Sequence, residues 1–161
     1  MLNAIIVDDE EFARSSLYFL IQENCENVNI VGIAKSVSEA RNLLNQQAID
    51  LIFLDIAMPK ENGFELIPAA QAANASVIFT TAYDQYAIKA IKANALDYLL
   101  KPIDIDELKL AVDKAKKFIN LNKTENNRNE SLKNLANDLT ERTSIKKITL
   151  PSGQGYRVVD I

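Results

Sequence analysis

The sequence predicts an α/β fold in which five parallel strands form one sheet with helices on both faces. Short apolar runs alternate with longer segments whose apolar residues recur every three or four positions. The connections between them are short, and residues 1–120 contain no hairpin signal between consecutive runs. Such alternation predicts a parallel sheet with right-handed crossover connections.

Each predicted strand is a short run dominated by apolar residues. A continuous apolar run is typical of a strand that is buried on both faces, in the middle of a parallel sheet. The clearest example is 51–54, which runs directly into Asp55. The five predicted strands are Ala4–Val7, Val28–Ala34, Leu51–Leu54, Ser76–Thr80 and Leu96–Leu100.

Helical periodicity follows each predicted strand. The first helix is predicted over 11–24. Ser36 and Glu39 have the spacing of a capping box at the start of the second, and Asp104 with Glu107 repeats the pattern at the start of the fifth. The third, over 64–73, contains Pro68, which would kink it if Pro68 lay beyond the first turn. The fourth is predicted over 85–95.

The composition changes after residue 120, which predicts three parts: a domain over 1–120, a linker with a helix over 121–142, and a β fragment over 143–161. Five asparagines between 120 and 129 indicate a linker. Leu132, Leu135 and Leu139 recur at helical spacing, and this stripe either docks on the domain or forms a dimer seam. Two short strand patterns joined by a tight turn then indicate the start of an incomplete second domain.

Composition excludes several classes of chemistry. The 161 residues include no histidine, so Ser-His-Asp catalysis and histidine-ligated zinc are excluded. Cys25 is the only cysteine, which rules out an internal disulfide and fits a reducing cytoplasm. The N-terminus has no basic region typical of a signal peptide, and no apolar run is long enough for a membrane span. We therefore expect a cytoplasmic protein without a membrane partner.

Charge is distributed unevenly along the chain. Residues 1–120 carry 11 basic and 17 acidic side chains, a net charge of −6, whereas residues 121–161 carry 7 basic and 5 acidic side chains, a net charge of +2. Because nucleic acids attract basic surfaces, the large N-terminal part is not expected to bind them by itself.

Polar groups complete four of the five predicted strands. Asp8 and Asp9 follow the first, Asp55 the third, Thr81 the fourth and Lys101 the fifth. Because the carboxyl ends of parallel strands meet at one edge of the sheet, these groups are expected to lie together. Taken singly, each has a plain structural interpretation: the acids can cap helices, and the threonine and lysine can be solvated surface residues. Their joint occurrence at successive strand ends favours a site.

The residue types at this edge suit phosphoryl chemistry. Crowded carboxylates repel one another unless one is protonated or a cation neutralises them, and oxygen ligands of this kind suit Mg²⁺. Lys101 and the hydroxyl of Thr81 can bind the oxygens of a phosphoryl group. An aspartate can itself be the nucleophile and form an acyl phosphate. The pattern is consistent with reversible phosphorylation of Asp55.

Residues 1–120 resemble the receiver domain of bacterial two-component response regulators. The motifs that match are Val7-Asp8-Asp9-Glu10, Leu54-Asp55-Ile56-Ala57-Met58-Pro59 with Asn62-Gly63, Thr81-Ala82, and Asp97-Tyr98-Leu99-Leu100-Lys101-Pro102. The resemblance implies a flavodoxin-like receiver fold and a sensor histidine kinase as phosphoryl donor.

The resemblance also implies a role for each site residue. Asp55 would be the phosphoacceptor, and Asp8, Asp9, Asp55 and the backbone carbonyl of Ala57 would hold Mg²⁺. The peptide bond before Pro102 would be cis. Thr81 and Lys101 would bind the phosphoryl oxygens, and Tyr98 would be a two-state switch residue coupled to Thr81.

The tail narrows the type of response regulator. Residues 146–161 resemble the opening of a LytTR-type DNA-binding domain, which follows receivers of the LytR/AlgR group. Tyr83, Tyr86-Ala87 and Asp97–Pro102 also resemble that group. The resemblance implies that the DNA-binding domain is truncated here, and that DNA is bound, and transcription controlled, only through the part beyond Ile161.

Two features depart from a typical pattern. Ala57 lies two residues after the phosphoacceptor and Tyr83 two after the threonine, at positions that influence how water reaches an acyl phosphate in this family. Ala57 cannot position a water and Tyr83 could shield the site, so we predict slow self-dephosphorylation. The charged pair Lys60-Glu61 has no explanation from the sequence.

Two other functions fit parts of the pattern. A phosphohydrolase with an aspartate nucleophile usually has a second acid two residues later, where this chain has Ala57. A flavin or nucleotide binder needs glycines or hydroxyls in its first loop, where this chain has residues Asp8 to Glu11, all acidic. Neither alternative fits as well as a phosphoacceptor switch that is not an enzyme.

A surface for self-association is predicted on the fourth helix, fifth strand and fifth helix. Lys89 and Lys92 on the fourth helix would face Asp104, Asp106 and Asp113 of a second copy. The alternative is an ordinary solvated surface.

Overall fold

A computed structural model describes the backbone of residues 1–139 and the side chains of residues 1–122. Residues Met1–Lys117 form one compact unit, and a second unit begins at Phe118. The β fragment predicted over 143–161 lies outside the described residues, as does the end of the predicted linker.

The predicted sheet is confirmed: all five strands are parallel, in the order β2-β1-β3-β4-β5. The order reverses between β1 and β3, because the chain builds outward from β1 in one direction and then in the other. Ligands of open α/β sheets bind at such a point, beyond the carboxyl ends of the strands. The strands are β1 (Leu2–Val7), β2 (Val28–Ala34), β3 (Leu51–Leu54), β4 (Ser76–Thr81) and β5 (Asp97–Leu100).

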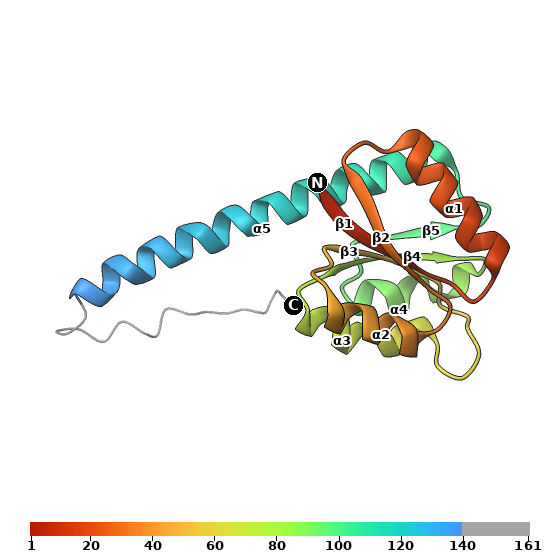
Figure 1. Cartoon of the computed structure of the whole chain (residues 1–161), viewed down its shortest axis with the longest axis horizontal. Helices are drawn as coiled ribbons and strands as arrows, with labels where there is room; N and C mark the ends of the chain where they lie inside the picture. Colours follow the sequence, from red (N-terminus) through yellow and green to blue (C-terminus); the bar gives the residue numbers. More distant parts are fainter. Residues whose placement is uncertain (140–161) are drawn as a thin grey trace. The chain divides into compact units, whose positions relative to one another are not determined.

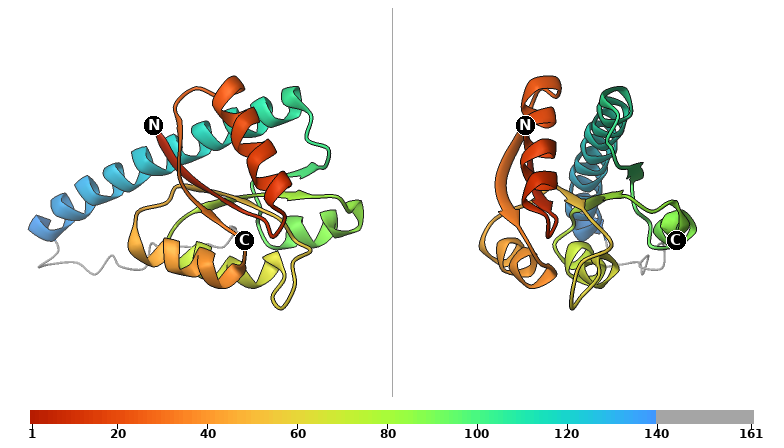
Figure 2. Two further views of the ribbon diagram at one scale, coloured as in Figure 1. Left: turned by 45° about the vertical axis from the view of Figure 1, so that its right-hand side comes forward. Right: turned by 90° about the vertical axis from the view of Figure 1, so that its right-hand side faces the viewer.

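Helices cover both faces of this sheet (Figures 1 and 2). The helix α1 and the first turns of α5 lie on one face, and α2, α3 and α4 lie on the other. The α-helices are α1 (Glu11–Asn24), α2 (Val37–Gln46), α3 (Ile67–Ala72), α4 (Ala87–Lys92) and α5 (Ile105–Leu139), and the 3₁₀ helices are η1 (Gly63–Leu66) and η2 (Asp84–Tyr86).

Alternate residues of the central strands fill two core layers. Ile5, Val7, Ile52 and Leu54 belong to a buried cluster that also contains residues of α2, α3 and α4. Their neighbours along β1 and β3 are also buried and point to the opposite face, because strand side chains alternate. Burial on both faces accounts for the continuous apolar runs and places the polar residues just beyond the strand ends.

The predicted caps form, with one difference. Ser36 Oγ accepts a hydrogen bond from the Glu39 amide at 3.1 Å, and Asp104 Oδ2 accepts one from the Glu107 amide at 3.0 Å. Glu39 reaches back to the amide of Lys35 instead of that of Ser36, at 3.1 Å. The start of α2 is therefore capped from both sides, although one bond of the predicted box is shifted by a residue.

Three helices differ from their predicted extents. The third begins as the 3₁₀ helix η1, so Pro68 lies in the first turn of α3, where no amide is required. The fourth is shorter than 85–95, because η2 precedes it and Ala93 ends it. The fifth continues through the asparagine-rich stretch that indicated a linker. That stretch has no glycine or proline, so composition alone does not end the helix.

Candidate functional site

Three aspartates lie together where the strand order reverses. Asp8 follows β1 and Asp55 follows β3, and the Asp55 amide donates a hydrogen bond to the Val7 carbonyl at 2.9 Å. One carboxylate oxygen from each of Asp8, Asp9 and Asp55 lies within 4.8 Å of the other two. Asp8 and Asp55 are buried and Asp9 is exposed, so the cluster opens to solvent on the side of Asp9.

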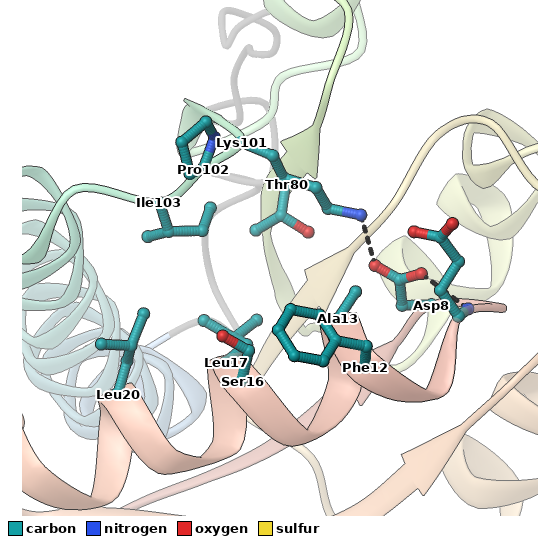
Figure 3. A pocket seen from close by; sticks show the side chains of 11 residues that line it. Asp8, Phe12, Ala13, Ser16, Leu17, Leu20, Thr80, Lys101, Pro102 and Ile103 are labelled. Atoms are coloured by element: carbon teal, nitrogen blue, oxygen red, sulfur yellow. Dashed lines mark hydrogen bonds and ion pairs between the residues drawn. The ribbon is translucent and has the colours of Figure 1, made fainter.

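Lys101 reaches this cluster from the end of β5. Its Nζ lies 2.6 Å from Asp8 Oδ2 (Figure 3). The same Nζ lies 3.8 Å from Asp55 Oδ2. The Lys101 amide donates to the Thr81 carbonyl at 2.7 Å, which fixes the lysine to the end of the neighbouring strand. The peptide bond between Lys101 and Pro102 is cis, as the resemblance implies.

Burial and like charge perturb the titration of this cluster. Burial, supported by the nearby charge of Asp8, raises the pKa of Asp55 to about 6, although Lys101 acts in the opposite direction. Burial lowers the pKa of Lys101, but its hydrogen bond to Asp8 and the charge of Asp55 outweigh this and raise it. The lysine therefore stays charged and, among the described residues, is the only basic group that forms a salt bridge with these carboxylates.

Thr81 ends β4 as a fully buried polar residue. Its Oγ1 accepts a hydrogen bond from the Tyr83 amide at 3.3 Å. The Tyr83 carbonyl in turn accepts a hydrogen bond from the Tyr98 hydroxyl. Tyr98 is half-buried and packs against the core, whereas Tyr83 is 49% exposed. A continuous set of bonds therefore joins the end of β4 to the tyrosine on β5.

The loop that leaves Asp55 returns to it at Gly63. The Gly63 amide donates to the Ile56 carbonyl at 2.9 Å, and a Cβ at Gly63 would lie 2.3 Å from the Asp55 carbonyl oxygen. No side chain fits at that distance, so a glycine is required for this close approach. Ala57 lies exposed between these two points, and Lys60 adopts a left-handed φ of 69°.

Sequence reasoning missed two supports of Asp8. The Arg14 guanidinium donates to the Asp8 carbonyl at 2.8 Å, and the Glu10 amide donates to Asp8 Oδ1 at 3.0 Å. Both donors lie at the start of α1, so the chain segment that follows the acids also orients them. The only signal in the sequence was an arginine one turn into the predicted helix.

A cavity of about 380 Å³ lies beside the acidic cluster, between α1 and the segment that follows β5 (Figure 3). Asp8 and Lys101 form its polar end. Phe12, which is 84% exposed, is part of its apolar wall. The lining residues are Asp8, Glu10, Phe12, Ala13, Ser16, Leu17, Leu20, Thr80, Lys101, Pro102 and Ile103.

The donor set fits a hard divalent cation. The three carboxylates offer oxygen ligands, which are those Mg²⁺ prefers, and one of them is open to solvent, so water can complete the coordination. Carboxylates within 4.8 Å of one another also repel, and a cation would relieve that repulsion.

The fold and this site define a receiver domain. The family model of the response regulator receiver domain matches residues 4–113, and the chain belongs to that family. Solved receivers share the fold: the response regulatory domain of mrkE from Klebsiella pneumoniae is 28% identical with a TM-score of 0.68, covering 74% of this chain and 99% of that one. The REC domain of AraT from Geobacillus stearothermophilus is 32% identical with a TM-score of 0.69, covering 76% and 98%.

The chain is also similar in sequence to curated sensory transduction proteins. Sensory transduction protein LytR of Streptococcus agalactiae is 44% identical over 123 residues, which are 74% of this chain and 50% of the relative. Sensory transduction protein LytT of Bacillus cereus is 40% identical over 119 residues, covering 73% and 48%. The chain thus spans about half the length of these two relatives and is similar to them over that part. Among the described residues, no helix combines the length and apolarity that crossing a membrane requires.

Proposed function

We propose that this chain is a phosphorylation-dependent switch that accepts a phosphoryl group on Asp55 from a sensor histidine kinase. The observation that carries the proposal is the group of three carboxylates within 4.8 Å of one another, with Lys101 Nζ 2.6 Å from Asp8. These 161 residues contain no histidine, so a phosphohistidine donor would lie outside them.

In the proposed reaction an oxygen of the Asp55 carboxylate attacks the phosphorus of the donor. A new O–P bond forms, the P–N bond to the imidazole breaks, and the nitrogen keeps the electron pair and takes up a proton. Asp8, Asp9, Asp55 and the Ala57 carbonyl would hold Mg²⁺, which neutralises charge on the phosphoryl oxygens.

Lys101 and Thr81 are the proposed partners of the new phosphoryl oxygens. Lys101 lies 3.8 Å from Asp55, so its ammonium needs only a small movement away from Asp8 to meet a phosphoryl group there. Thr81 is buried at the neighbouring strand end. Charged and hydroxyl donors of this kind stabilise phosphoryl oxygens strongly in a site with little water.

Tyr98 is the proposed reporter of phosphorylation. Thr81 Oγ1 accepts from the Tyr83 amide and the Tyr83 carbonyl accepts from Tyr98, so a movement of Thr81 toward the phosphoryl group changes the position of Tyr98. A local charge change is then read out by a residue with two positions.

The surface of α4, β5 and α5 is the proposed output face. Ile88 and Ile91 are 69% and 73% exposed, while the small Ala90 packs inward. Lys89 and Lys92 lie on the same helix, and Asp104 and Asp106 lie at the start of α5. Exposed apolar residues flanked by opposite charges favour pairing of two copies through this face. Such pairing would bring together DNA-binding domains of the type found in LytTR regulators, and so control transcription.

The alternative is a phosphohydrolase that uses Asp55 as a nucleophile. Ala57 stands where such an enzyme needs a second acid, and it offers only a methyl group. The switch is therefore favoured over the enzyme.

Incubation of the chain with acetyl phosphate and Mg²⁺ tests the proposal. A single phosphoryl group per chain that persists after excess donor is removed supports the switch. Rapid release of phosphate with no accumulated adduct supports the hydrolase instead. Lys101→Met is a useful companion variant, because it keeps the nucleophile and removes the proposed phosphoryl partner.

A further inference from the structure

The loop between Asp55 and Gly63 carries the Ala57 carbonyl but has few fixed points of its own. Met58 is buried in the core, and Ala57, Pro59 and Lys60 are exposed. The backbone folds back on itself twice, with Met58 N to Ile56 O at 3.1 Å and Glu61 N to Pro59 O at 2.7 Å. Lys60 is held at a φ of 69°, which is unfavourable for a lysine.

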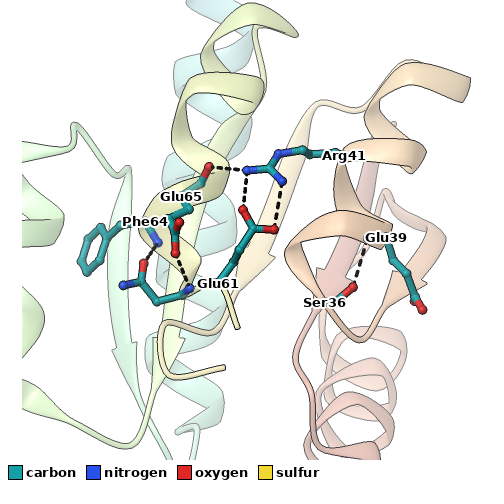
Figure 4. A network of polar contacts seen from close by, with 7 residues as sticks. Ser36, Glu39, Arg41, Glu61, Phe64 and Glu65 are labelled. Atoms are coloured by element: carbon teal, nitrogen blue, oxygen red, sulfur yellow. Dashed lines mark hydrogen bonds and ion pairs between the residues drawn. The ribbon is translucent and has the colours of Figure 1, made fainter. Parts of the chain in front are cut away.

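An ion pair from α2 holds this loop from outside. Arg41 Nη1 and Nη2 donate to the two carboxylate oxygens of Glu61, at 3.0 and 2.8 Å (Figure 4). Within residues 1–122, these are the only side-chain hydrogen bonds from another element to residues 57–61. A bidentate arginine–carboxylate pair fixes orientation as well as distance.

The same arginine also joins the loop to the start of η1. Arg41 Nη2 lies 3.3 Å from the Glu65 carbonyl, and Glu65 Oε2 accepts a hydrogen bond from the Asn62 amide at 2.9 Å. Asn62 Oδ1 in turn accepts from the Phe64 amide at 2.9 Å, which completes a capping box. The loop is therefore held at Glu61 and Asn62, immediately after the strained Lys60.

We propose that Arg41 and Glu61 are positioning residues that hold the loop so that the Ala57 carbonyl can complete the Mg²⁺ site. This inference rests on the proposed function, because it concerns the same site. It also gives the acidic half of the charged pair Lys60-Glu61 a role: Glu61 is the anchor that keeps the loop in this strained conformation.

The effect of charge alone runs opposite to the effect of positioning. Arg41 is positively charged. If it acts only through long-range electrostatics, removing it makes the potential at the acidic site more negative and tightens Mg²⁺ binding. If the ion pair positions Ala57, its removal weakens Mg²⁺ binding instead. The direction of the change therefore separates the two roles.

Calorimetric titration of the full chain with MgCl₂ alone, without a phosphoryl donor, tests the proposal. We expect Arg41→Ala to weaken Mg²⁺ binding roughly three- to tenfold. This loss is at or below the roughly 10- to 100-fold loss of affinity that is typical when a residue that orients a metal ligand is mutated. Arg41→Lys keeps the charge and loses the fork, so it should also weaken binding. The double variant with Arg41→Ala and Glu61→Ala should bind Mg²⁺ no more weakly than either single variant, because both changes remove the same interaction.

Lys114→Ala is the matched control. It also removes a positive charge and breaks an exposed ion pair, the 3.7 Å contact with Asp97, but it does not touch the loop. We expect no loss of Mg²⁺ affinity. Equal affinity of wild type, Arg41→Ala and Arg41→Lys would overturn the proposal, as would tighter binding in Arg41→Ala. Phosphorylation of the wild type on Asp55 is scored separately, so failure of the proposed function is distinguishable from failure of the positioning role.

Discussion

The ammonium of Lys101 lies 2.6 Å from Asp8 Oδ2 and 3.8 Å from Asp55 Oδ2, so one lysine is shared between two buried aspartates. It lies closer to Asp8, which is proposed to bind only the metal, than to Asp55, which is proposed to bind the metal and to accept the phosphoryl group. A cation at Asp8 and a phosphoryl group at Asp55 would both draw it toward Asp55. This arrangement makes Lys101 a link between cation binding and phosphorylation.

Replacing Lys101 with methionine should increase the dependence of the fold on Mg²⁺. Without the ammonium the three carboxylates lose their basic neighbour and repel one another more strongly. We expect a lower melting temperature than wild type in EDTA and a larger rise on addition of MgCl₂. Thermal melts with and without Mg²⁺ measure both. A variant whose melting temperature in EDTA equals that of wild type would contradict this account of Lys101.

Replacing Asp55 with asparagine should stabilise the metal-free protein above pH 6. In the folded protein the pKa of the Asp55 carboxyl is about 6, which is above its ordinary value. The carboxyl therefore stabilises the fold fully only below its ordinary pKa, and this stabilisation is lost as the pH rises through 6. The neutral amide avoids that loss, so we expect its free energy of unfolding to exceed that of wild type by about 1–2 kcal/mol after allowance for solvent screening. Urea unfolding in EDTA at pH 4 and pH 8 measures it. Equal gains at both pH values would show that the carboxyl does not titrate as described.

Ala57 and Tyr83 should set the lifetime of the phosphorylated state. Ala57→Asn adds a side chain that can position water, and Tyr83→Ala removes a residue that could shield the site. We expect faster decay of the acyl phosphate in both variants, on the order of tenfold for the double variant by analogy with groups that orient a reacting water. Decay of isolated phosphorylated protein in Mg²⁺ is the measurement. Unchanged rates in both variants would refute the prediction.

Gly63→Ala should disturb the site without touching a charged group. The added Cβ would lie 2.3 Å from the Asp55 carbonyl oxygen, which is backbone and cannot rotate away. Overpacking of this kind lowers the free energy of unfolding by about 1–3 kcal/mol. We expect a lower unfolding midpoint and slower phosphorylation. Ala72→Gly, at an exposed position in the last turn of α3, is a control for the change in glycine content, and it should leave the phosphorylation rate unchanged.

Much of the fold and site was predictable because the chemistry changes abruptly at the strand ends. The apolar run of β3 ends at Asp55, and those of β1 and β4 end at Asp8 and Thr81, so a parallel sheet brings these residues to one edge. The predicted and observed bounds agree exactly for β2, β3 and α1, within one residue for β4 and β5, and at the C-terminal end for β1. Local pattern was sufficient for these elements because each is buried on both faces or amphipathic.

Other features depend on contacts between distant residues and were not predictable. Arg41 and Glu61 are twenty positions apart, and no spacing rule joins an arginine on one helix to a glutamate in a later loop. The requirement for Gly63 follows from its approach to the Asp55 carbonyl, which only the folded backbone defines. The length of α5 was missed because asparagines indicated a linker, although nothing in the stretch breaks a helix.

Chemical mapping of the phosphorylated residue tests the central claim most directly. The chain is incubated with acetyl phosphate and Mg²⁺ and then reduced with borohydride, which converts an aspartyl phosphate to homoserine, and the peptides are sequenced by mass spectrometry. We predict homoserine at position 55 in the wild type and none in Asp55→Asn. Homoserine at Asp8 or Asp9 in the wild type, or an equal yield in Asp55→Asn, would contradict the account.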